Sequence, residues 1–61
     1  MNCVVHIFMP MGDYLVFPFD ISHEGEVARC METALVQLRV EHPRVNIRDV
    51  RIEISFETRD P

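Results

Sequence analysis

Residues 50–58 read VRIEISFET, a stretch in which apolar and polar side chains alternate through Glu57. Successive side chains of a strand point to opposite faces, so this period of two predicts a half-buried β-strand. Its apolar face would carry Val50, Ile52, Ile54 and Phe56, and its charged face would lie in water. Such a strand needs another element to cover its apolar face.

A helical pattern precedes this strand and supplies that cover. Residues at the spacing i, i+4, i+7, i+8 and i+11 form one apolar stripe, namely Val27, Met31, Ala34, Leu35 and Leu38, with Cys30 at its border. Asp20 or Ser22 would cap the helix start, and Pro43 would end it. We predict a helix over about residues 23–42, long enough to lie along the sheet and cover it.

The first twenty residues predict a β-hairpin. Residues 2–9 and 14–19 are rich in β-branched, sulfur-containing and aromatic side chains, which is typical of strands. Residues 10–13 between them read PMGD, and proline and glycine are typical of turns. Proline has no backbone N–H, so Pro18 favours an edge position for the second strand.

Together these segments predict a single α+β domain over residues 1–61, in the order strand–strand–helix–strand (ββαβ). One amphipathic helix would pack on one face of a three-stranded sheet. A right-handed crossover through the helix favours a third strand that lies beside the first. The expected sheet order is therefore 2-1-3, with antiparallel ladders.

Size and charge limit the classes of partner. A chain of 61 residues buries only about 60% of the surface that its unfolded form exposes, so a partner surface would add useful burial. The net charge of −4 opposes contact with nucleic-acid phosphates and anionic lipids. We expect no nucleic acid and no membrane as partners. With no signal peptide pattern and no close cysteine spacing, we expect a cytoplasmic protein with reduced thiols.

The titratable residues give weak signals for metal binding or catalysis. Zinc sites draw two ligands from one short motif, whereas here only Cys3 and His6 are close in sequence, and in a strand they would point to opposite faces. Cys30 borders the apolar stripe of the helix, where a thiol is a poor nucleophile. We expect no metal, no cofactor and no catalytic residue. Cys3 and Cys30 are expected as core residues, and a disulfide between them is geometrically possible.

The most informative functional feature is apolar surface that the core does not use. The helix can cover only one face of the hairpin. The side chains of the opposite face would be Val4, His6, Phe8, Tyr14 and Val16. On the helix, Val36 and Val40 lie opposite the stripe and next to each other. An apolar centre with aromatic residues and a polar rim is typical of a docking surface.

These features suggest two functional hypotheses. The first is a small, acidic, non-enzymatic protein–protein interaction module: a subunit, adaptor or inhibitor that docks on a larger protein, or on a second copy, through the outer face or edge of its hairpin. The seven residues named above would bind the partner, with Val4, Phe8, Tyr14 and Val16 as anchors. The alternative is a small oligomeric enzyme with its active site at a subunit interface. Its candidate participants would be His6, Asp20, His23 and Cys30.

Overall fold

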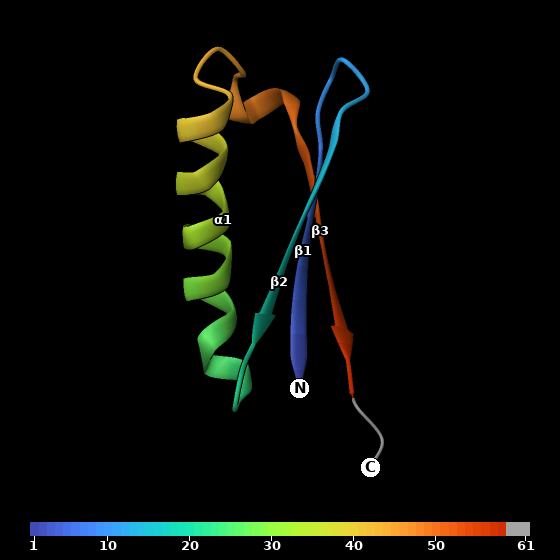
Figure 1. The fold of residues 1–61 in the computed structure, drawn as a ribbon, viewed down its shortest axis with the longest axis vertical. Coiled ribbons are helices and arrows are strands. Elements are labelled where there is room, and N and C mark those ends of the chain that lie inside the picture. The colour runs from blue at the N-terminus through green and yellow to red at the C-terminus, as the bar shows by residue number, and fades with distance from the viewer. Residues whose placement is uncertain (59–61) are drawn as a thin grey trace.

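The computed structural model describes residues 1–58, which form three strands and one α-helix in the predicted order (Figure 1). The elements are β1 (Asn2–Phe8), β2 (Tyr14–Asp20), α1 (Val27–Glu41) and β3 (Arg51–Glu57). The strands form one sheet in the order β2-β1-β3, and both ladders are antiparallel. The α+β class, the single helix on one face of the sheet and the sheet order are thus confirmed.

The hairpin ladder has a register that is fixed at both ends. The N–H of Ile21 donates to the carbonyl of Met1, and the N–H of Met9 donates to the carbonyl of Asp13, each at 2.9 Å. Backbone groups alternate in direction along a strand, so odd-numbered residues of β2 bond to β1 and even-numbered ones face the free edge. Pro18 is even-numbered and lies opposite Val4. Its missing N–H therefore breaks no ladder bond.

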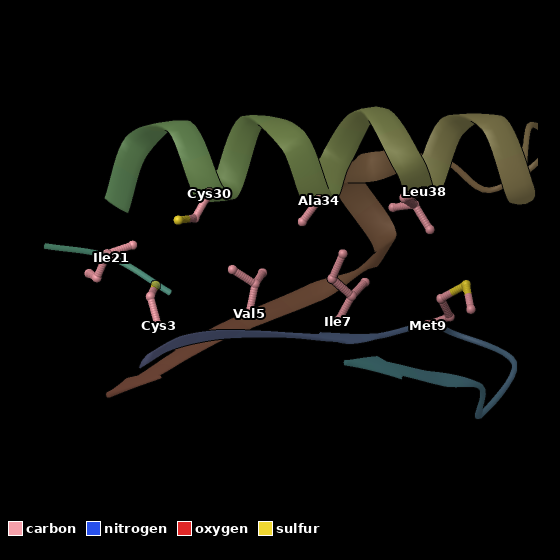
Figure 2. Packing of buried hydrophobic residues seen from close by; sticks show 8 residues of the cluster. All are labelled: Cys3, Val5, Ile7, Met9, Ile21, Cys30, Ala34 and Leu38. Carbon is pink, nitrogen blue, oxygen red and sulfur yellow. The ribbon is translucent and has the colours of Figure 1, made fainter. Parts of the chain in front are cut away.

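The core lies between α1 and the inner face of β1 (Figure 2). Its buried side chains are Cys3, Val5, Ile7, Met9, Ile21, Cys30, Ala34 and Leu38. Cys30, Ala34 and Leu38 point from one face of the helix toward β1. Cys30 was predicted at the border of the apolar stripe but lies in its buried centre, whereas Val27 and Leu35 flank that centre and are half-buried.

The helix begins later than the predicted residue 23, because a 3₁₀ turn over Glu24–Glu26 precedes α1. Neither Asp20 nor Ser22 caps it. Instead, Nδ1 of His23 accepts a hydrogen bond at 3.2 Å from the backbone N–H two residues on. The Glu26 carboxylate accepts from the N–H groups of Ser22 and His23, at 2.5 and 3.3 Å. This is a capping box in which histidine replaces the usual hydroxyl residue.

The Glu26 cap is sensitive to acid. Its two backbone donors favour the charged form and lower the pKa of the carboxyl below its ordinary value of 4.5. A carboxyl whose pKa is lowered by folding adds stability above its unfolded pKa, and that stability is lost as the pH falls through the folded pKa. We expect the melting temperature to drop less between about pH 5 and pH 3 in Glu26→Gln than in the wild type, as followed by circular dichroism.

Glu24→Gln is the matched control for this measurement, because Glu24 lies in the same turn and accepts neither of the two hydrogen bonds. It should keep the acid sensitivity of the wild type. Equal loss of melting temperature in the wild type and in Glu26→Gln would contradict the capping role.

The helix does not cover the inner face evenly, which departs from the prediction that it would cover the sheet. Because α1 lies over the central strand, the apolar residues of both edge strands stay partly open. Leu15, Phe17 and Phe19 of β2 are half-buried, as are Ile52 and Ile54 of β3. The side chain of Phe56 is 50% exposed.

Candidate functional site

The outer face of the sheet, opposite α1, gathers all five hairpin residues that the sequence predicts as partner-binding. Figure 1 shows the helix on one side of the sheet only. Even-numbered residues of β1 and β2 share the other side, where the register places Phe8 beside Tyr14 and His6 beside Val16. We call Phe8, His6, Tyr14, Val16 and Arg51 of β3 the outer patch.

An arginine–phenylalanine–tyrosine stack crosses all three strands within the outer patch. The rings of Phe8 and Tyr14 stack with their centroids 4.7 Å apart and an interplanar angle of 22°. The guanidinium carbon of Arg51 lies 4.5 Å from the centroid of the Phe8 ring. An exposed cation–π contact of this kind contributes about 0.5–1 kcal/mol. The stack restrains these side chains before any partner binds, which reduces the entropy lost on binding.

His6 connects β2 to β3 through side-chain hydrogen bonds. Its Nδ1 lies 2.5 Å from the hydroxyl of Tyr14, and its Nε2 lies 2.8 Å from Oγ of Ser55. A neutral imidazole donates from one nitrogen and accepts at the other, so each hydroxyl has one bond to the ring. The imidazole therefore holds the Tyr14 ring in place, although that side chain is 49% exposed.

The Ser55–His6–Tyr14 chain has the order nucleophile, base and orienting group that acyl transfer uses. Such catalysis also needs N–H donors aimed at a developing oxyanion. His6 lies on the central strand, whose backbone N–H groups lie in the plane of the sheet and bond to β2 or β3. The N–H groups of Ile54 and Phe56, which flank Ser55, point in the plane of the sheet toward the free edge of β3, whereas the Ser55 hydroxyl bonds to His6 on the outer face. We interpret this hydrogen-bonded series as cross-strand support of the outer patch.

The four residues of the enzymatic hypothesis are not brought together within the chain. Cys30 is buried between α1 and β1, on the opposite side of the sheet from His6. His23 caps the 3₁₀ turn. The carboxylate of Asp20 lies 3.9 Å from the N-terminal amino group of Met1 and is largely exposed.

The two cysteines meet inside the core, as the sequence predicts. Both thiols are free and buried. Burial, together with the neighbouring thiol of Cys30, raises the pKa of the Cys3 thiol above its ordinary value of 9.0. A raised pKa keeps a thiol in its unreactive protonated form. Cys3 therefore behaves as a small apolar core residue.

The comparisons with known proteins assign no family to the chain. No protein-family model, curated protein or solved structure matches it. Within residues 1–58, no three His, Cys, Asp or Glu side chains are grouped so that they could hold a metal ion. The same part of the chain has no helix that is both long and apolar enough to cross a membrane. The cytoplasmic location stays a prediction.

The predicted partner-binding residues differ in the surface that they offer. Val36 and Val40 on α1 are 55% and 70% exposed, and Val16 on β2 is 45% exposed. Val4 lies on the outer face but is only 6% exposed, because it sits on the central strand between Pro18 and Ser55. Val4 was predicted as an anchor, and its burial leaves little of its side chain for a partner to contact.

Sequence reasoning missed two residues of the outer face. Arg51 and Ser55 were expected only as part of the solvated face of their strand. Their contacts with Phe8 and His6 depend on the β1–β3 register, which pairs Arg51 with Phe8 and places Ser55 one step from His6. The alternation of residues 50–58 predicts the face on which these side chains lie but does not predict their neighbours.

Proposed function

We propose that this chain is a non-enzymatic protein–protein interaction module that binds a protein partner through the outer patch. The observation that carries the proposal is the Arg51–Phe8–Tyr14 stack, which is ordered and yet exposed at its Tyr14 end. Tyrosine, arginine and other aromatic residues dominate the binding energy of interfaces. The adjacent Val16 extends the apolar surface beside the stack.

The charges around the outer patch favour a particular kind of partner. Glu53 and Glu57 are exposed on β3, and Asp20 is exposed at the end of β2. The whole chain carries a net charge of −4. A partner with an apolar recess for the Tyr14 ring and a basic rim would therefore be complementary in shape and in charge.

The exposed valines of α1 are a weaker candidate surface. Val36 and Val40 are neighbours on the helix, and they lie on the side that faces away from the sheet. Isolated apolar side chains are common on protein surfaces. This pair also has no aromatic or arginine residue in an ordered stack like that of the outer patch. We therefore place the main docking surface on the sheet.

Affinity capture followed by titration tests this function. The immobilised chain would be exposed to lysate of its native host, the bound proteins identified by mass spectrometry, and the purified partner titrated against each variant. We expect Tyr14→Ser to weaken binding at least about 30-fold, the effect of losing 2 kcal/mol at an interface anchor. Val40→Ser is the matched control on the helix and should bind as the wild type does.

Tyr14→Phe separates a binding role from a structural one. It keeps the ring that stacks on Phe8 and removes the hydroxyl that bonds to His6. If the ring is the anchor, Tyr14→Phe should retain most of the affinity that Tyr14→Ser loses. Absence of a specific partner, or equal binding by the wild type and Tyr14→Ser, would contradict the proposed function.

A further inference from the structure

The free edge of β3 presents unpaired backbone groups. Odd-numbered residues of β1 bond to β2, so its even-numbered residues bond to β3. Their partners across that ladder are the odd-numbered residues of β3. The N–H and C=O groups of Ile52, Ile54 and Phe56 therefore point away from the sheet, along an edge that no other strand of residues 1–58 covers.

The other edge of the sheet is less suited to pairing. The even-numbered residues of β2 face that edge, and one of them is Pro18. A proline in this position removes a donor from the middle of any new ladder. Of the two edges, β3 alone offers an unbroken series of donors and acceptors.

The same three residues of β3 also carry open apolar side chains. Ile52 and Ile54 are half-buried on the inner face, and Phe56 is 50% exposed there. A strand paired along this edge would cover these three side chains.

We propose that a second copy of this chain pairs with β3 in antiparallel orientation, about a two-fold axis at Ile54. The two sheets would then become one continuous sheet with both helices on the same face. On that face, Ile54 would lie opposite its own copy, and Ile52 opposite Phe56 of the second copy. The apolar side chains that α1 leaves open would thus cover one another. This proposal concerns the edge of β3 and the inner face of the sheet, whereas the proposed function concerns the outer patch, and Arg51 is the one residue that belongs to both.

Charge complementarity and the number of paired residues together select this register. With the axis at Ile54, all seven residues of β3 pair, and Arg51 lies opposite Glu57 of the other copy, twice by symmetry. With the axis moved to Glu53, two glutamates would face each other. With the axis at Ser55, Glu53 would face Glu57. With the axis at Ile52 or Phe56, only three residues of β3 would pair, although Arg51 would face Glu53 in the first case. Like charges directly opposite each other destabilise a ladder, whereas opposite charges stabilise it.

Hydrogen exchange measured at low and high concentration tests the paired edge directly. The free-edge amides of Ile52, Ile54 and Phe56 should exchange rapidly in the dilute chain and become protected as the concentration rises. The amides of Glu53 and Ser55 bond to β1 and should be protected throughout. Light scattering on the same samples should give a molar mass rising toward twice 7.2 kDa.

A charge-reversal pair tests the register. Glu57→Arg would place like charges opposite each other at two symmetric positions, and we expect the dimer dissociation constant to rise about tenfold. Adding Arg51→Glu should restore the affinity of the wild type, because the pair is then reversed rather than broken. Both side chains are exposed, so neither substitution removes core packing. Because Arg51→Glu also removes the contacts of Arg51 with Phe8 and Glu53, Arg51→Glu alone is measured as the control for those losses.

Three results would overturn the proposal. The first is a molar mass of 7.2 kDa at every concentration up to the solubility limit. The second is concentration-dependent protection at Tyr14 and Val16 without protection at Ile54, which would place the contact on β2. The third is failure of Arg51→Glu to rescue Glu57→Arg while both variants keep the wild-type melting temperature. None of these results bears on capture of a partner by the outer patch.

Discussion

Replacing Leu38 with alanine is expected to leave much of the chain unfolded at 25 °C. Leu38 is 1% exposed and is among the largest side chains of the core. A buried leucine truncated to alanine costs about 2–5 kcal/mol. A domain of 61 residues has a total stability of only about 3–9 kcal/mol. Urea denaturation followed by circular dichroism would show a large fall in the free energy of unfolding, or no folded baseline.

Val36→Ala is the matched control for this substitution. It removes apolar atoms from the same helix, but the side chain of Val36 is 55% exposed. Its effect on the free energy of unfolding should stay within about 0.5 kcal/mol. If Leu38→Ala and Val36→Ala had equal effects, the packing of α1 against the sheet would be disproved.

Enlarging Ala34 to leucine is expected to destabilise the fold by a different mechanism. Ala34 is fully buried and points from the middle of α1 toward β1 (Figure 2). Added carbon atoms at such a position force the helix away from the sheet, at a cost of about 1–3 kcal/mol or more. In a domain of this size, the melting temperature falls by about 4–8 °C for each kcal/mol.

Gln37→Leu serves as the control for Ala34→Leu. It introduces the same side chain on the same helix, but at an exposed position. Leucine is a good helix former, so the melting temperature should be unchanged or slightly raised. An unchanged melting temperature in Ala34→Leu would mean that the helix stands off from β1, contrary to the structure.

Local patterns were sufficient to predict the elements of this fold. The alternation from Val50 to Glu57 predicted β3, and Pro43 marked the end of α1, which closes with the N–H of His42 bonded to the carbonyl of Leu38 at 2.8 Å. The lack of an N–H on Pro18 predicted an edge strand. Each of these signals depends on residues that are close together in the sequence.

The errors arise where tertiary contacts decide the outcome. The apolar stripe of the helix includes both Cys30 and Leu35, and the periodicity alone cannot say which of them faces the central strand. The start of α1 depends on the side chains of His23 and Glu26 bonding to nearby backbone N–H groups. For this reason neither of the conventional N-cap residues, Asp20 and Ser22, caps the helix.

The outer patch was predictable in part. The hairpin pattern placed His6, Phe8, Tyr14 and Val16 on one face, where the structure also has them. The contribution of Arg51 required the β1–β3 register, which joins residues at opposite ends of the chain. Its function in binding remains a proposal.

The central position of β1 also has a consequence for how the chain folds. Asn2 pairs with Asp20 across a tight hairpin but with Glu57 across nearly the whole sequence. The hairpin closes a short loop, whereas the second ladder of β1 must close almost the longest loop that the chain allows. Native pairings so distant in sequence slow folding. We therefore expect the pairing of β3 with β1 to limit the rate of folding.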